Sequence, residues 1–176
     1  MMMRMLDAAG LPIVTDHERS ADEDNPKGYY EYERVKELDK GGDSSWMLEH
    51  RGKVVKIISF LLTDLPDSCS YKVIFMRRNL DEVLASQNKM LVRRGEDGGG
   101  TDDAKMKRLY MGHLAKVDGW MSQQMNFETI DVNYSGVISD AAGEAARLEK
   151  FLGLQGKAGV MAEAVDASLF RNRRGT

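Results

Sequence analysis

Apolar residues gather in stretches of two kinds along the chain, some near-continuous as in strands and others spaced as in helices. The run Tyr71–Met76 has the apolar character of a buried strand. The stretch Lys53–Leu62 is rich in β-branched residues, interrupted by Lys56, and also predicts a buried parallel strand. The short alternating run Phe127–Val132 predicts a third strand.

Helical spacing or helix-end signals mark the segments around these strands. Asn79 is placed to cap a helix directly after Tyr71–Met76, and Asp81 and Glu82 fall in its first turn, where the helix dipole favours negative charge. Strands separated by helices predict an α/β fold with a mostly parallel sheet, in a single domain over residues 1–176. One helix is expected after Tyr32, through about Leu38. The other expected helices are Met1–Ala9, Trp46–His50, Leu80–Arg94, Asp102–Gln124, Asp140–Leu152 and Lys157–Val165.

The composition is that of an ordinary globular protein, with 42% apolar and 30% charged residues. A net charge of −3 gives no general reason to expect nucleic acid as a partner, so any anion site has to be local. The single Cys69 excludes an internal disulfide and fits a reducing compartment. No apolar run has the length of a membrane span, and no secretory signal is recognisable, so a cytoplasmic protein without membrane contact is expected.

The end of the strand Tyr71–Met76 carries the most specific candidate chemistry. Arg77 and Arg78 stand where the apolar run stops, and Ser86 follows eight positions after Arg78. A fixed cation at a strand end, followed by a helix that carries a hydroxyl, is suited to hold a phosphate. Adjacent strand side chains point to opposite faces, so the two arginines are not expected to serve one phosphate. The alternative is an ordinary turn with solvated arginines and ion pairs worth at most about 1 kcal/mol.

This block resembles the 3′-phosphate motif of the P-loop sulfotransferases. In that family a strand ends in Arg, followed by Asp or Asn, usually Pro, and a Ser eight positions after the Arg. Arg78, Asn79 and Ser86 match this pattern, whereas Leu80 replaces the usual Pro. Asp24–Glu31 (DNPKGYYE) is similar to a segment of bacterial members, and the stretch from Asn133 to the FLG of residues 151–153 is similar to another of their blocks.

The resemblance implies a three-layer α/β/α fold of the P-loop NTPase type. It also implies a reaction, transfer of a sulfuryl group from 3′-phosphoadenosine 5′-phosphosulfate to a hydroxyl or amine of a small-molecule or carbohydrate acceptor. In this family the reaction needs no metal. The chain itself shows no cluster with metal-ligand spacing, since one cysteine and three scattered histidines argue against a zinc site.

One part of the family pattern is absent. Members begin with a strand and a Gly-rich loop for the phosphosulfate, followed by a helix, and Met1–Leu6 looks like that helix. We therefore expect an N-terminally truncated fold that is inactive as this chain stands, and an open apolar sheet edge that favours homo-oligomers. One alternative is a non-catalytic nucleotide-binding or interaction module. A relative of the nucleotide kinases is a further alternative, but it needs magnesium ligands after a strand.

The resemblance also suggests roles for individual residues. Arg78 would pair with the 3′-phosphate and Ser86 would donate its hydroxyl to it. Lys56 would stand beside the sulfuryl group and stabilise charge on the bridging oxygen, or else its stem extends to water from the strand. His17, in a charged loop, is the candidate general base that takes the acceptor's proton, unless this loop is simply solvated.

Two further candidates lie at the end of the chain. Arg173 and Arg174 resemble a basic segment near the family's C-terminus that also touches the 3′-phosphate. The alternative is a frayed basic tail.

Overall fold

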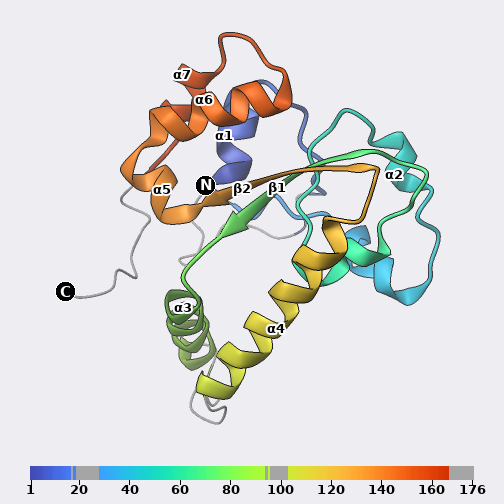
Figure 1. Cartoon of the computed structure of the whole chain (residues 1–176), viewed down its shortest axis with the longest axis vertical. Coiled ribbons are helices and arrows are strands. Elements are labelled where there is room, and N and C mark those ends of the chain that lie inside the picture. Colours follow the sequence, from blue (N-terminus) through green and yellow to red (C-terminus); the bar gives the residue numbers. More distant parts are fainter. Residues whose placement is uncertain (17, 19–27, 94, 96–102, 167–176) are drawn as a thin grey trace.

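The computed structural model describes residues 1–16, 18, 28–93, 95 and 103–166, and a two-stranded parallel sheet runs through its middle (Figure 1). β1 (Tyr71–Arg77) pairs with β2 (Phe127–Asn133), residue by residue along their whole length. Both strands are confirmed where the apolar pattern predicted them. Parallel neighbours need a long crossover connection, and here it contains two helices, α3 (Leu80–Arg93) and α4 (Asp103–Met121).

Most predicted helices are confirmed, with small shifts at their ends. Asn79 caps α3 as expected, because its side-chain oxygen accepts a hydrogen bond from the Asp81 amide at 2.9 Å. The segment up to Leu38 is a 3₁₀ helix, and a short helix directly after β2 was not predicted. The remaining helical elements are α1 (Met2–Ala8), η1 (Glu33–Lys40), α2 (Trp46–Glu49), η2 (Ser59–Asp64), α5 (Tyr134–Ser139), α6 (Ala141–Leu152) and α7 (Ala158–Glu163).

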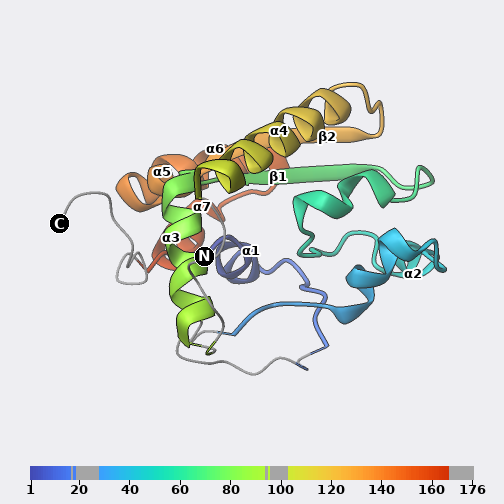
Figure 2. The same cartoon turned by 90° about the horizontal axis from the view of Figure 1, so that it is seen from below.

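A hydrophobic cluster covers each face of the sheet. Val73 and Phe75 belong to the first cluster, with side chains from η1, α2, η2 and α4. Ile74 and Met76 belong to the second, with side chains from α1, α5, α6 and α7. Figures 1 and 2 show α1 and α5 to α7 grouped together, with α2 at the far end of the sheet. The sheet therefore forms the common wall of both clusters, and the described chain is a mixed α/β structure.

The predicted strand Lys53–Leu62 is wrong over most of its length. Val54 forms one isolated parallel bridge with Ile13, and residues from Ser59 onward form η2. Ile58 and Phe60 are 58% and 56% exposed, so the apolar run does not enter a sheet that covers both of its faces. An apolar run becomes a strand only where a neighbouring strand supplies hydrogen bonds, and here one bridge is found on one side.

None of the helices in the described ranges is both long and apolar enough to cross a membrane.

Candidate functional site

An open pocket of about 1050 Å³ runs along the edge of β1 that is not paired with β2. Its walls come from β1, from α1, from residues 50–57 and from Tyr134 at the start of α5. Met76, near the carboxyl end of β1, and Tyr134, which follows β2, line the pocket, whereas Arg78 and Ser86 do not. Figure 2 shows α3 beginning beyond the carboxyl end of β1.

The pocket lining is basic although the whole chain carries a net charge of −3. Among the described lining residues, Glu128 supplies the only carboxylate, and it is paired with Lys72 at 2.8 Å. A locally positive, partly enclosed surface in an acidic chain favours an anionic ligand. The cationic side chains of the lining are Arg4, Arg51, Lys53, Lys56 and Lys72.

The amino terminus adds a further positive group to this lining. Burial lowers the pKa of the Met1 amino group, and the positive charges of Arg4 and Lys56 lower it further. These three groups are therefore close enough to interact electrostatically. An anion bound between them would relieve their mutual repulsion.

Arg78 lies at the carboxyl end of β1 and is held by an aromatic ring. Its guanidinium carbon lies 4.9 Å from the centroid of the Tyr134 ring, and Tyr134 lines the pocket. Its Nε donates to Glu82 at 3.4 Å, which is a long contact. Within the described part of the chain, its two terminal nitrogens have no hydrogen-bond partner. The part of the guanidinium that forms a bidentate fork is thus available to a ligand.

Arg77 has a different and purely internal set of partners. Its guanidinium binds Asp118 of α4 at 2.5 Å and Asp131 of β2 at 3.0 Å, and it lies 4.0 Å from the ring centroid of Phe75. Arg77 therefore joins β1, β2 and α4. The two adjacent arginines therefore have different partners, as the alternation of strand side chains predicted.

Ser86 lies half-buried on α3, and its hydroxyl has no hydrogen-bond partner in the described part of the chain. Glu82 and Ser86 are four residues apart and so share one helix face, with Ser86 about 6 Å further along the axis. Glu82, which contacts Arg78, lies between the two residues predicted to hold a phosphate. A phosphate between Arg78 and Ser86 would have to displace the Glu82 carboxylate from Arg78.

Lys56 lines the pocket from an extended stretch. Its ammonium donates to the Tyr29 carbonyl at 3.1 Å and to Glu31 at 3.0 Å, and it is half-buried. Lys56 is thus neither free in solvent nor buried within a strand. To contact a ligand, the ammonium must either use its third donor or give up one of these two bonds.

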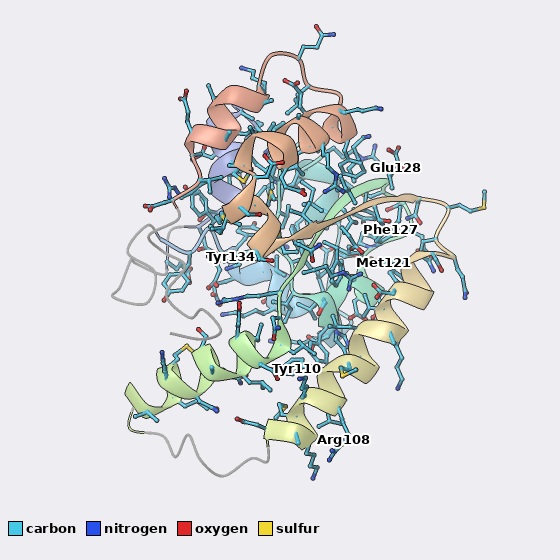
Figure 3. The ribbon with its side chains drawn as sticks, turned by 60° about the vertical axis from the view of Figure 1, so that its left-hand side comes forward. Arg108, Tyr110, Met121, Phe127, Glu128 and Tyr134 are labelled. Atoms are coloured by element: carbon cyan, nitrogen blue, oxygen red, sulfur yellow. The ribbon has the colours of Figure 1, made fainter. Side chains whose placement is uncertain are left out.

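Two tyrosines of the pocket carried no predicted role. Tyr30 has a left-handed backbone with φ of 51°, which is uncommon outside glycine, and its hydroxyl donates to Asp7 at 3.4 Å. Tyr134 follows β2 directly, and Figure 3 places it at the junction of β2 and α5. Its position after a predicted parallel strand was the available signal, because carboxyl ends of parallel strands meet at one sheet edge.

His17, Arg173 and Arg174 lie outside the described residues, so their predicted roles stay predictions. His113 lies on α4, where it contacts the Ser59 hydroxyl at 2.9 Å and stacks on Phe60. The described residues contain no group of three or more side chains arranged to hold a metal ion.

Comparison with protein-family models, with curated proteins and with solved structures found no match to this chain.

Proposed function

We propose that this chain is a sulfotransferase-type domain that binds the adenosine 3′-phosphate part of 3′-phosphoadenosine 5′-phosphosulfate. The proposal rests on the position of the Arg78 guanidinium at the carboxyl end of β1. This guanidinium is held on the Tyr134 ring, and its terminal nitrogens have no partner among the described residues. The basic pocket lining beside it supports an anionic ligand with several negative charges.

In this proposal Arg78 forms a fork with the 3′-phosphate, and Ser86 donates its hydroxyl to the same group. The N-terminus of α3, a helix of 14 residues that starts two positions after Arg78, adds a favourable dipole. Arg4 and the Met1 amino group face the more distant charges of the nucleotide. Arg173 and Arg174 are proposed as additional phosphate contacts.

The transfer step is proposed to follow an in-line displacement. The acceptor's hydroxyl or amine attacks the sulfuryl sulfur, the bond to the bridging oxygen breaks, and the nucleotide leaves as adenosine 3′,5′-bisphosphate. Lys56 would stabilise the negative charge on that oxygen, and His17 would take the acceptor's proton. The finer fold proposed with this function is the three-layer arrangement of the P-loop type, in a cytoplasmic protein.

The 176-residue sequence contains no match to the Gly-rich loop that holds the 5′-phosphosulfate in the family. Removing a single well-placed oxyanion donor costs about 100- to 1000-fold in rate, so the loss of a whole loop should abolish useful transfer. We therefore expect nucleotide binding without efficient sulfuryl transfer from these 176 residues. A non-catalytic nucleotide-binding module is the second candidate, and the available fork of Arg78 fits it equally well.

Calorimetry with adenosine 3′,5′-bisphosphate and with adenosine 5′-monophosphate tests the binding site. We expect Arg78→Ala to weaken binding of the bisphosphate by about 10- to 150-fold, the range of a hydrogen bond to a charged group. The monophosphate lacks the 3′-phosphate, so its affinity should be the same for both proteins. Equal affinity of the two proteins for the bisphosphate would refute the role of Arg78.

An assay of sulfuryl transfer separates the two candidate functions. A chain extended upstream by a strand and a phosphosulfate loop should transfer the group if the domain is catalytic. Binding of the bisphosphate without transfer by such an extended chain favours the non-catalytic module.

A further inference from the structure

Apolar side chains are exposed side by side where α4 packs against η2, on the outside of the molecule (Figures 2 and 3). Leu109 on α4 is 59% exposed, and Ile58 and Phe60 are exposed to a similar extent. Residues four apart share a helix face, so Leu109 is the neighbour of His113 one turn further along α4. The ring of Phe60 stacks on His113. We call this surface, made of Ile58, Phe60, Leu109 and His113, the η2–α4 patch.

The aromatic part of the patch is fixed by contacts within the chain. The Phe60 and His113 ring centroids are 3.6 Å apart, and the ring planes differ by 6°. His113 Nε2 also lies 2.9 Å from the Ser59 hydroxyl, which holds the imidazole from its other side. A rigid aromatic ring that stays exposed on a folded protein is typical of the anchor residues of protein interfaces.

Two lysines stand at the ends of the same row on α4. Lys105, Leu109, Gly112 and Lys116 follow one another at intervals of four, three and four residues, so they lie along one helix face. The ion pairs of α4 in the described chain involve other residues, and both of these lysines are exposed. They are eleven residues apart, which is about 16 Å along the helix axis.

The middle of this row is open to another helix. A Cβ added at Gly112 would have no heavy atom within 4 Å, so nothing in the described chain occupies the space above it. A glycine inside a helix costs stability relative to alanine, and packing within this chain does not explain it. The bare backbone between the two lysines would let a partner helix approach α4 closely.

The carboxylates of α4 and η2 do not neutralise the two lysines. Asp103 and Asp118 of α4 are bound by side chains of α3 and β1, on the opposite side of the helix. Asp64 of η2 lies one 3₁₀ turn after the buried Leu61, and so on a different side of η2 from Phe60. The patch is therefore an apolar surface bordered by positive charge, on a chain of net charge −3.

We propose that the η2–α4 patch docks an acidic amphipathic helix of a partner protein. The partner helix lies along α4 and packs its apolar side chains on Phe60 and Leu109. One carboxylate lies opposite Lys105 and another opposite Lys116, so the two carboxylates are about three helical turns apart in the partner. This inference does not depend on nucleotide binding.

A second copy of this chain fits the patch less well. In an antiparallel pair of two α4 helices centred on this row, Lys105 of each copy faces Lys116 of the other, and like charges at close range oppose association. An anionic membrane would attract the same lysines, but its response would not depend on the spacing between two carboxylates. A spacing-dependent response therefore separates a partner helix from a membrane.

Fluorescence anisotropy with labelled synthetic peptides and the full chain tests the docking. The probe is an alanine-based helical peptide with a stripe of leucines between two glutamates eleven residues apart. One control peptide has Lys in place of both glutamates, and another has its glutamates seven residues apart. We expect the probe to bind at least about 5-fold more tightly than the Lys peptide at low salt, and more tightly than the short-spaced peptide. The first difference should shrink at high salt.

Variants of the patch provide the matched test. Lys105→Glu combined with Lys116→Glu should invert the preference, so that the Lys peptide binds more tightly than the probe. Leu109→Ser should weaken binding of the probe at least about 10-fold, the scale of an interface anchor. Val160→Ser changes an exposed apolar residue of α7 and should leave probe binding as it is. Urea midpoints check that each variant is folded.

Three results would overturn the proposal. The first is no binding of the probe, or equal affinity for all three peptides. The second is binding to phosphatidylcholine vesicles that contain phosphatidylserine, lost in the double lysine variant, without a preference between the two glutamate spacings. The third is self-association in sedimentation experiments that Leu109→Ser abolishes, which would assign the patch to a second copy.

Discussion

The guanidinium of Arg78 lies over the ring of Tyr134, 4.9 Å from its centroid, and so connects the end of β1 to the first residue of α5. A side chain that is held in place before a ligand arrives loses less conformational entropy on binding. In the proposed function, this contact would prepare Arg78 for a phosphate, although the two residues are far apart in the sequence.

Replacing Tyr134 by Leu should weaken binding of adenosine 3′,5′-bisphosphate about 2- to 5-fold. The change removes the aromatic face but keeps an apolar side chain, and a cation–π contact of this kind is worth about 0.5–1 kcal/mol. Tyr134→Phe keeps the ring and should bind nearly as well as the unchanged chain. The check is calorimetry of the three proteins, and an unaltered affinity of Tyr134→Leu would show that the ring does not position Arg78.

Replacing Arg77 by Met should lower the free energy of unfolding by about 1–2 kcal/mol, because two carboxylates lose their common partner. Its bonds run to β2 and α4, so bisphosphate affinity should not change. Urea titration measures the loss. Lys36→Met provides the comparison, since its pair with Glu33 is exposed and should contribute less than about 0.5 kcal/mol.

Truncation to Ala should destabilise the fold at one methionine and have little effect at another. Met5 is 0% exposed in the cluster beneath the sheet, so Met5→Ala should cost about 2–5 kcal/mol of unfolding free energy. Met125 is 103% exposed, and Met125→Ala should change it by less than about 0.5 kcal/mol. Denaturant midpoints of the two variants decide the matter, and similar losses would mean that Met5 is not part of a packed core.

Stability should depend on the protonation of the Met1 amino group. Its pKa is lowered from 8.0 in the folded chain, chiefly by burial. Between the two pKa values the unfolded chain binds more protons, so the free energy of unfolding rises as the pH approaches 8.0 and levels off above it. A pKa difference of one corresponds to about 1.4 kcal/mol.

Acetylation of that amino group is the control, because the acetylated chain cannot take up the proton. The acetylated protein should be the more stable of the two at neutral pH, and the difference should shrink at alkaline pH. A constant difference across this range would mean that the amino group keeps its ordinary pKa.

Local signals in the sequence predicted those parts of the fold that local interactions determine. The apolar run of β1, the Asn79 cap and the amphipathic spacing of α4 each specify their own element. The stretch Lys53–Leu62 has an equally apolar pattern, yet among the described residues it pairs on one side only, through a single bridge. Its structure depends on tertiary pairing, which periodicity does not encode.

In the candidate site, too, local signals predicted the position of a residue in the chain but not its tertiary contacts. The place of Arg78 at a strand end follows from the pattern of Tyr71–Met76. Its contact with Tyr134 depends on the pairing of β1 with β2, which brings the carboxyl ends of both strands together. The partners of Arg77 come from two other elements, and no spacing in the sequence points to them.

Consecutive residues of β1 pack into different hydrophobic clusters, Phe75 into the first and Met76 into the second. Separation of β1 from β2 would expose both clusters together, so we expect the two clusters to unfold together. Heating should consequently produce a single sharp loss of structure, with fluorescence of Trp46 and Trp120 on one side and probes near Met5 on the other changing in step.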